Sequence, residues 1–332
     1  MTATTFVHRQ SAHCESGVVS AMLTHHGLPL SEPMAFGLAS ALTFARIPIV
    51  KISGMPLIAY RMPPRSIIRG VGKRLGIRMR FRTFRSPAEG MTALDGMLAA
   101  GRIVGLQTSV FWLPYFPEEM RFHFNAHNLI AFARDGAGYR LSDPVFEAPV
   151  TCDRLALQKS RFARGLMAPR GLMYYPEELP ERIEFQRAIP AAVRASYRIM
   201  MQAPFPFVGV RAIRRLGREL VQTAQRSGGD YRYFRLLLTH IVRMQEEIGT
   251  GGAGFRFVYA AFLAEAAGIL GDHRYAEAAD RMTQAGDRWR EFAVQATRMA
   301  KARDTVDPAE LATTLDDCAA REAAIWGLLK AI

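Results

Sequence analysis

The chain has 332 residues, which exceeds the usual size of one domain and predicts two domains, each able to bury a core. Nearly half of the residues (49%) are hydrophobic, which excludes a disordered protein, and no uncharged apolar run reaches the roughly 18 to 20 residues that span a bilayer, so we expect no stable membrane insertion. The formal charge of +13 favours an acidic partner but does not distinguish nucleic acid, membrane surface and protein.

The first ten residues lack a basic segment followed by an apolar one, so we expect a cytoplasmic protein without a secretory signal. Cys14, Cys152 and Cys318 are widely spaced and form no CxxC pair, which predicts free thiols rather than a zinc site or a disulfide. His13 and Glu15 flank Cys14, but adjacent side chains rarely converge on one ion. We therefore expect no metal.

In chain order, the N-terminal half mixes short helices with strand-like runs. One helix is predicted over residues 14–26, closed by Gly27, and a second over 31–42. A short helix over 91–100 precedes an apolar, branched segment over 102–110 that is typical of a buried strand. Two more strands, 127–133 and 139–142, flank the sequence Asp-Gly-Ala-Gly and predict a hairpin.

The C-terminal half has a different character. Residues 176–180, Pro-Glu-Glu-Leu-Pro, predict a linker because two prolines bracket a polar stretch. From about Ile183 onward the periodicity is helical, and the last helix begins with Asp307 as its cap and Pro308 at its first position. We therefore predict an α+β domain over residues 1–178 and a mostly α-helical domain over residues 179–332.

Cys14 stands where the first predicted helix begins. The positive field of a helix start favours the thiolate, which is the form that accepts an acyl group. The unpaired backbone N–H groups of the first turn can also hold an oxyanion. The simpler alternative is that Cys14 is a small buried hydrophobe, as most cysteines are. Its position alone makes Cys14 a candidate nucleophile and no more.

His127 opens one strand of the predicted hairpin, and Asp143 follows the other. If the loop occupies residues 134–136, the paired residue numbers sum to about 270 and His127 faces Asp143. A loop at 135–137 makes them diagonal neighbours on one face, roughly 7 to 8 Å apart. A slip of one residue would separate them. The pair suits a base and its orienting carboxylate, although an ordinary strand and turn is the plain alternative.

His123 is a rival base, because it lies four residues before His127 and would share its face in a longer strand. We prefer His127, since the apolar residues that follow it form a firmer strand. A rigid element positions a catalytic group better than the aromatic loop around His123.

Residues 33–88 contain no acidic residue and many basic ones. Such a surface would speed the encounter with an acidic partner and orient it. Nucleic acid would be drawn by the same field, but the stretch has no zinc spacing or base-reading motif, so we expect a protein partner and no nucleic acid. A merely solvated face is the alternative. The residues expected to dock the partner are Arg69, Lys73, Arg74 and Arg78.

The glycine-rich segment 249–254 is not expected to bind nucleotide, because no strand precedes it and no Gly-Lys-Ser/Thr follows. Such glycines allow close approach of two backbones, and here they would let the helical domain fit against the catalytic cleft as a lid. Three residues that follow can share a helix face and are candidates for substrate contact or for a buried ion pair between helices. They are Arg256, Tyr259 and Glu265.

Several motifs in this order resemble the butirosin biosynthesis protein H family. The markers lie in both halves of the chain: His13-Cys14-Glu15-Ser16, Gly27-Leu28-Pro29-Leu30-Ser31-Glu32 with Phe36-Gly37-Leu38, Leu113-Pro114-Tyr115, His127, Ser142-Asp143-Pro144, Glu247 to Arg256, Tyr259, and Phe262 to Ala266. The resemblance implies a papain-like acyltransferase domain followed by a helical domain, with Cys14, His127 and Asp143 at the catalytic positions.

The resemblance also implies a reaction in specialised metabolite biosynthesis. An acyl group would move from the phosphopantetheine thioester of an acidic acyl carrier protein to a small-molecule amine, through an acyl-cysteine and without a cofactor of the chain's own. Gln10 is too close to Cys14 to match the upstream glutamine that donates to the oxyanion in related papain-like enzymes. The alternatives are a cysteine peptidase or amidase, in which water accepts the acyl group, and a non-catalytic basic binding protein.

Overall fold

The computed structural model describes residues 6–52, 54–136, 138–301 and 307–330. The chain divides into two compact units, one of residues 1–35 and 64–183 and one of residues 36–63 and 184–332. The division passes through α2 (Glu32–Leu38). Each unit is built from segments that are distant in sequence.

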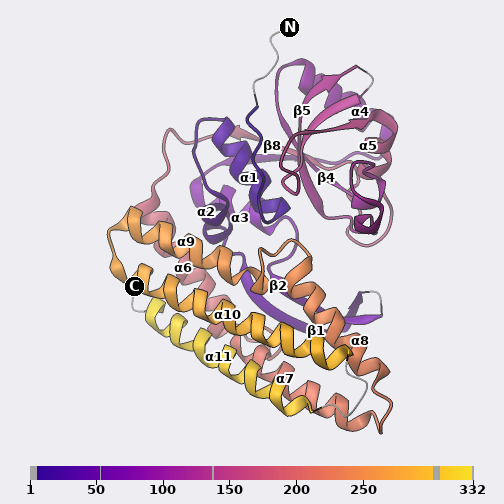
Figure 1. Cartoon of the computed structure of the whole chain (residues 1–332). Coiled ribbons are helices and arrows are strands. Elements are labelled where there is room, and N and C mark those ends of the chain that lie inside the picture. Colours follow the sequence, from indigo (N-terminus) through magenta and orange to yellow (C-terminus); the bar gives the residue numbers. More distant parts are fainter. Residues whose placement is uncertain (1–5, 53, 137, 302–306, 331–332) are drawn as a thin grey trace. The chain divides into compact units, whose positions relative to one another are not determined.

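The first unit is built on a six-stranded antiparallel sheet with the strand order β3-β8-β4-β5-β6-β7. Figure 1 labels β8, β4 and β5 of this sheet. Helices α1 and α4 contact β5, and α5 contacts β4. The elements of this unit are α1 (Cys14–His25), α3 (Ser66–Leu75), β3 (Arg78–Arg82), α4 (Pro87–Ala99), β4 (Val104–Thr108), η1 (Val110–Trp112), η2 (Glu118–Met120), β5 (His127–Asp135), β6 (Gly138–Ser142), β7 (Val150–Asp153), α5 (Arg154–Arg161) and β8 (Met173–Glu178).

The apolar runs of the sequence form the core of this unit. All five residues of β4 are buried, as are the first six of β5, because helices contact both strands. Helix α1 starts at the predicted residue, where the His13 side chain caps it by accepting the N–H of Ser16. The chain then turns at Gly27, whose φ of 84° suits a residue without a Cβ.

The second unit is mostly helical and includes one hairpin. Its elements are β1 (Leu42–Ile52), β2 (Met55–Arg61), α6 (Phe185–Gln202), α7 (Val210–Arg226), α8 (Arg232–Val242), the π-helical turn η3 (Arg243–Glu247), η4 (Ala253–Phe255), α9 (Arg256–Leu270), α10 (His273–Lys301) and α11 (Pro308–Lys330). Asp307 caps α11 by accepting the N–H of Ala309 across 2.9 Å, as predicted. The predicted fold class, an α+β N-terminal part with a helical C-terminal part, is confirmed.

The observed units differ from the predicted division at residue 178. Residues 176–178 of the predicted linker form the end of strand β8, which pairs with β3, and the first unit continues to residue 183. The β1–β2 hairpin lies in the N-terminal half but belongs to the helical unit. The rings of Phe44 and Tyr60 are buried there, and each lies 5.6 Å from the indole of Trp289 on α10. The predicted helix over 31–42 is also too long, since α2 ends at Leu38 and a strand follows. The apolar face of the hairpin is covered by residues more than 200 positions away, which a local pattern does not reveal.

The stretch Ala253–Leu270 has the length and mean hydropathy (1.4) of a membrane-crossing helix. More than half of it is buried within the protein, as in the core helix of a globular domain, and it carries the charged residues Arg256 and Glu265. Its apolar character is accounted for by packing in the second unit.

Candidate active site

The accessible thiol of the chain lies where α1 begins. Cys14 is the first residue of the helix and is partly exposed, whereas Cys152 and Cys318 are buried. Burial raises the pKa of the Cys152 thiol to about 12 and raises the pKa of the Cys318 thiol as well. Both stay neutral at ordinary pH, so Cys14 is the candidate nucleophile.

Glu32, at the start of α2, holds the backbone that leads into Cys14. Its carboxylate accepts hydrogen bonds from the N–H groups of Ala12 (2.8 Å) and His13 (2.7 Å) and from the hydroxyl of Ser16 (3.0 Å). Burial raises the pKa of Glu32, and these donors oppose the rise. Because three donors converge on one carboxylate, the entry of the chain into α1 is fixed.

The segment before Cys14 also lies against the loop that carries Asp143. The N–H of Ser11 donates to the carbonyl of Pro144 across 2.9 Å. Gly17 of α1 permits this approach, since a Cβ at that position would lie 2.5 Å from the Cβ of Ser11 and 3.1 Å from the Cβ of Pro144. The thiol and the carboxylate are therefore brought into one region by backbone contacts.

His127 and Asp143 form a hydrogen-bonded pair. The Nε2–H of His127 donates to Oδ2 of Asp143 across 2.7 Å, and the ring of Phe116 packs edge-on against the imidazole at 5.5 Å. Burial lowers the pKa of His127, but the charge of Asp143, its hydrogen bond and the contact with Cys14 together raise that pKa to about 10. The ring keeps its proton at neutral pH and can pair with a thiolate through Nδ1.

Three donors orient the Asp143 carboxylate, which is fully buried. Oδ2 accepts from His127 and from the hydroxyl of Tyr115 (2.9 Å), and Oδ1 accepts from the N–H of Val145 (3.1 Å). Burial and the adjacent carboxylate raise the pKa of Tyr115, so the phenol remains a hydrogen-bond donor. Tyr115 appeared in the sequence as part of a family marker, without an assigned role.

A β-bulge brings His127 and Asp143 to one face of the sheet. Next to the turn, Asp135 pairs with Gly138, a register in which His127 and Asp143 would lie on opposite faces. A register shift between Ala131 and the turn moves the pairing by one residue. Beyond it the two residues are diagonal neighbours, which is the second of the two predicted arrangements. His123 lies before the strand, exposed, with its ring stacked on Phe111.

Two buried polar side chains beside Cys14 were not identified from the sequence. The amide nitrogen of Asn128, the residue after His127, lies 4.0 Å from the Cys14 sulfur and donates to the carbonyl of Ala126 across 3.1 Å. The hydroxyl of Tyr174 on β8 donates to Oδ1 of Asn128 across 3.0 Å. The available signal was an asparagine inside the apolar run of a buried strand, which requires hydrogen-bond partners.

The structure places Arg256 and Tyr259 in the core of the second unit, where both are fully buried. Nε of Arg256 donates to Oε1 of Glu322 across 2.9 Å, and the indole N–H of Trp289 donates to the same oxygen across 2.7 Å. For Arg256 the alternative of a buried ion pair between helices is therefore what the structure shows. Glu265 is partly exposed, and its contact with substrate remains a prediction.

The glycine-rich segment serves the packing of the second unit itself. A Cβ on Gly254 would lie 2.1 Å from the ring of Tyr60, and the φ of Gly254 is 56°. A Cβ on Gly252 would lie 2.7 Å from the guanidinium of Arg290. Close approach is thus required inside this unit, and the predicted fit against the catalytic cleft remains a prediction.

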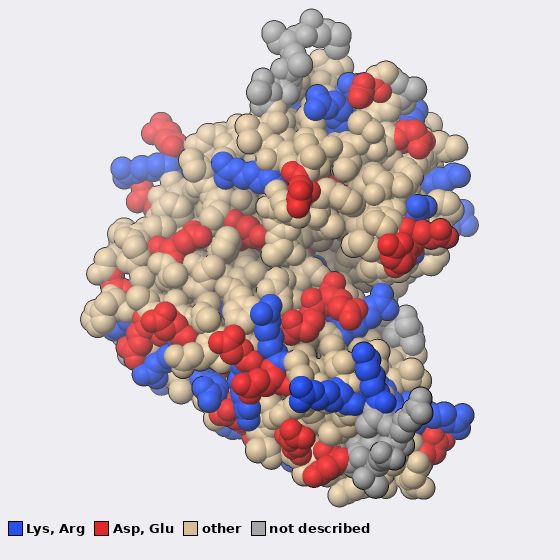
Figure 2. Space-filling model, viewed as in Figure 1, with Lys and Arg blue, Asp and Glu red and all other residues tan. Residues whose placement is uncertain are grey.

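The predicted docking residues lie on two elements of the first unit. Arg69 and Lys73 are exposed on α3, Arg74 is partly exposed there, and Arg78 is exposed on β3. Arg78 is paired with carboxylates of β8, including Glu177 at 3.7 Å, which reduces its free charge. On the face drawn in Figure 2, basic and acidic side chains are interspersed.

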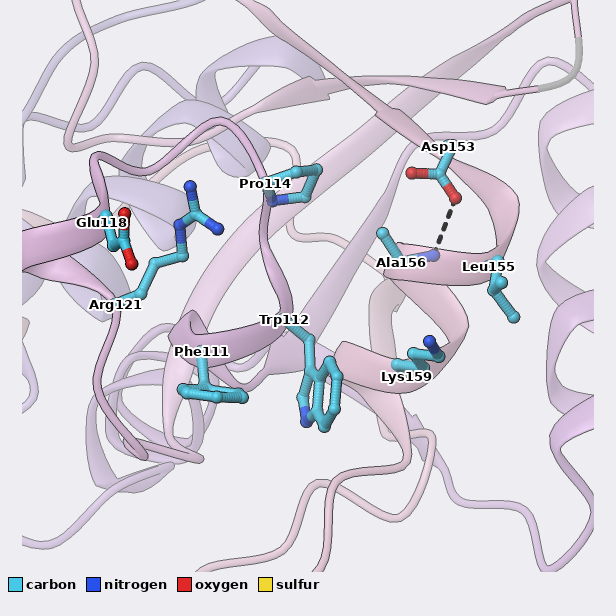
Figure 3. Close-up of a pocket in the computed structure, with 9 residues that line it drawn as sticks. All are labelled: Phe111, Trp112, Pro114, Glu118, Arg121, Asp153, Leu155, Ala156 and Lys159. Atoms are coloured by element: carbon cyan, nitrogen blue, oxygen red, sulfur yellow. Dashed lines mark hydrogen bonds between the residues drawn. The ribbon is translucent and has the colours of Figure 1, made fainter.

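A surface hollow of about 550 Å³ lies elsewhere on the first unit. Trp112 stands between Arg121 on one side and Lys159 on the other, and the Lys159 ammonium lies 5.4 Å from the centre of the indole (Figure 3). The lining residues, all within the described ranges, include none of the candidate triad. They are Phe111, Trp112, Pro114, Glu118, Arg121, Asp153, Leu155, Ala156 and Lys159.

Across the described part of the chain, no group of three or more metal-ligating side chains occurs.

A partly exposed thiol at a helix start beside a buried histidine–carboxylate pair defines a cysteine-based enzyme of the acyltransferase or peptidase type. The chain belongs to the butirosin biosynthesis protein H family: its N-terminal model matches residues 13–144, and a domain of unknown function, DUF4872, matches residues 155–329. No curated protein matches the chain. A crystal structure from Bacillus anthracis, described as that of a C39-like peptidase, is similar with a TM-score of 0.37 and 14% identity, over 53% of this chain and 97% of that one.

Proposed function

We propose that this protein transfers an acyl group from the thioester of an acidic acyl carrier protein to a small-molecule amine, through an acyl-Cys14 intermediate. The observation that carries the proposal is the accessible Cys14 beside His127, whose other nitrogen is held by Asp143 at 2.7 Å. The family name links the chemistry to specialised metabolite biosynthesis, and we place the reaction in the cytoplasm.

In the first half-reaction the Cys14 thiolate attacks the carbonyl carbon of the donor thioester. The electrons of the C=O bond move to oxygen, and backbone N–H groups at the start of α1 stabilise the resulting oxyanion. Collapse of this intermediate breaks the bond to the donor sulfur. The departing thiolate takes the proton of the His127 imidazolium, which leaves a neutral imidazole and an acylated cysteine.

In the second half-reaction an amine attacks the acyl-cysteine. His127, now neutral, accepts a proton from the amine nitrogen while Asp143 holds the ring in the required tautomer. The Cys14 thiolate leaves, and an amide is released. Any phosphopantetheine group in this scheme belongs to the donor protein, so the chain needs no cofactor of its own.

The intact mass of the protein after mixing with acyl carrier proteins tests the proposal. Acylation at Cys14 that persists until an amine is added supports transfer. Acylation that disappears without an amine supports hydrolysis of the peptidase or amidase type. The absence of any adduct, with an iodoacetamide-reactive Cys14, would reject a thioester donor and favour a binding protein.

A further inference from the structure

We propose that the side-chain amide of Asn128 is the second oxyanion donor of this site, held in position by Tyr174. The inference rests on the proposed role of Cys14 as the nucleophile. The amide nitrogen of Asn128 is 4.0 Å from the Cys14 sulfur, which is one bond from the carbon that bears the oxyanion. An N–H at that place can donate to an oxygen that appears only during reaction.

The orientation of the amide is fixed from both ends. Oδ1 accepts the Tyr174 hydroxyl at 3.0 Å, and the nitrogen donates one N–H to the carbonyl of Ala126 at 3.1 Å. Burial, with the nearby Glu15 and Cys14, raises the pKa of Tyr174, so its hydroxyl keeps its proton and donates. Because Oδ1 faces a donor, the amide nitrogen must face Cys14, and its second N–H is directed toward the site.

The upstream glutamine does not occupy this place. Gln10 is exposed, and its amide nitrogen donates to the carbonyl of Val145 across 3.2 Å. Asn128 is 3% exposed and lies on β5, a rigid strand paired on both edges. A donor on a buried strand needs no rearrangement when charge develops, which is the property that makes an oxyanion donor effective.

The Asn128→Leu variant tests the assignment, because leucine has a similar size and no N–H donor. With a small acyl thioester of N-acetylcysteamine, we expect the rate of Cys14 acylation to fall by about 10²- to 10³-fold. Alkylation of Cys14 by iodoacetamide forms no oxyanion and should proceed close to the wild-type rate. Tyr174→Phe should give a smaller loss of acylation, since the amide remains but is less firmly oriented.

If Asn128→Leu alone destabilises the fold, two further variants still test the role of Asn128. The double variant Asn128→Leu/Tyr174→Phe removes both partners of the buried hydrogen bond and should fold while still acylating slowly. Gln10→Ala should acylate at the wild-type rate. Rapid acylation by the folded Asn128→Leu protein would overturn the proposal. An equal loss of alkylation would also overturn it, because it would show that Asn128 acts on the Cys14 thiolate before the reaction. Failure of the wild-type protein to acylate at all would instead reject the proposed function.

Discussion

Asp143 raises the pKa of His127, the histidine that contacts Cys14. Its carboxylate is buried, accepts three hydrogen bonds and keeps the pKa of His127 at about 10 despite the burial of the ring. The imidazole of His127 therefore carries its proton at neutral pH and is ready to protonate a leaving thiolate. Two consequences can be tested at the level of single residues.

Replacement of the triad should affect the rate in a graded way. Cys14→Ala and His127→Ala should each reduce transfer by about 10⁴-fold or more, because nucleophile and base act as one unit. Asp143→Asn should retain a reduced rate, about 10²- to 10⁴-fold below wild type. Single-turnover transfer assays measure these losses. His123→Ala serves as the control and should have a modest effect, since that ring is exposed; a loss equal to that of His127→Ala would show that the base is misassigned.

The raised pKa of His127 makes stability depend on pH with a definite sign. The folded protein holds the proton more tightly than the unfolded chain, so the contribution is complete below the ordinary pKa of 6.5 and is lost as the pH rises through about 10. Thermal unfolding between pH 6 and 10.5 should show this decline in the wild type. The Asp143→Asn protein should show a flatter profile over the same range, and identical profiles would contradict the role of the carboxylate.

Among the elements, α1 and the β5–β6 hairpin create the site by their contacts. The bulge in β5 corrects a register that would otherwise separate His127 from Asp143. Gly17 then lets α1 come close to the loop after β6, and Cys14 at the start of α1 contacts His127. The geometry of the triad depends on these two small backbone features.

Gly17→Ala should disturb the site without touching the triad. The added Cβ would clash with Ser11 and crowd Pro144, so we expect a loss of about 1–3 kcal/mol in the free energy of unfolding, together with slower acylation. Denaturant unfolding and single-turnover acylation measure the two effects. Gly96→Ala in α4 is the matched control, because its Cβ would meet nothing within 4 Å, and it should be neutral or slightly stabilising. Equal behaviour of the two variants would contradict the packing role of Gly17.

For the molecule as a whole, neither unit is one continuous stretch of sequence. The β1–β2 hairpin interrupts the sequence of the first unit but belongs to the second, helical unit. Ile58 and Phe44 of the hairpin are fully buried. Each unit therefore needs both of its segments to bury its apolar surface.

A truncated chain of residues 1–183 should fold poorly. It would expose the apolar face of the hairpin, whose partners lie on α10, and we expect binding of a hydrophobic dye and low solubility. The same truncation with residues 36–63 replaced by a Gly/Ser linker should bind less dye and give a cooperative unfolding transition. Far-ultraviolet circular dichroism and dye fluorescence distinguish the two proteins. Equal solubility and dye binding would show that the hairpin does not depend on the helical segment.

The basic face of α3 should matter for a protein donor and not for a small one. Arg69→Glu with Lys73→Glu should raise the KM for the carrier-bound donor, because exposed charges accelerate encounter and set orientation, and should leave a small thioester nearly unaffected. Increasing salt should weaken wild-type docking, since the screening length is roughly 8 Å at about 0.15 M ionic strength. Arg298→Glu with Lys301→Glu on α10 is the control with the same change in net charge. Equal losses for both donors would indicate damage to the fold, and unchanged kinetics would place docking elsewhere.

The sequence by itself determined the local features of this protein. The start of α1 at Cys14 and the helical C-terminal part followed from helical periodicity and end signals. The candidate triad followed from the pairing register of the hairpin together with the family motifs. The helix start, the helical periodicity and the pairing of His127 with Asp143 depend on residues within a few positions of one another, or on one tight turn, so local rules suffice. The addition of Cys14 to that pair rested on the family motifs. The basic segment could also be read directly, because charge is a property of composition.

Only the tertiary structure decided which distant segments cover one another. It assigned the hairpin 42–61 to the helical unit, paired Arg256 with Glu322, and placed Asn128, Tyr174 and Tyr115 around the triad. A bulge in the register is also invisible to an alternating pattern, since one extra residue leaves the composition unchanged. These features depend on contacts between residues far apart in sequence, and a buried polar group finds its partners only when the chain has folded.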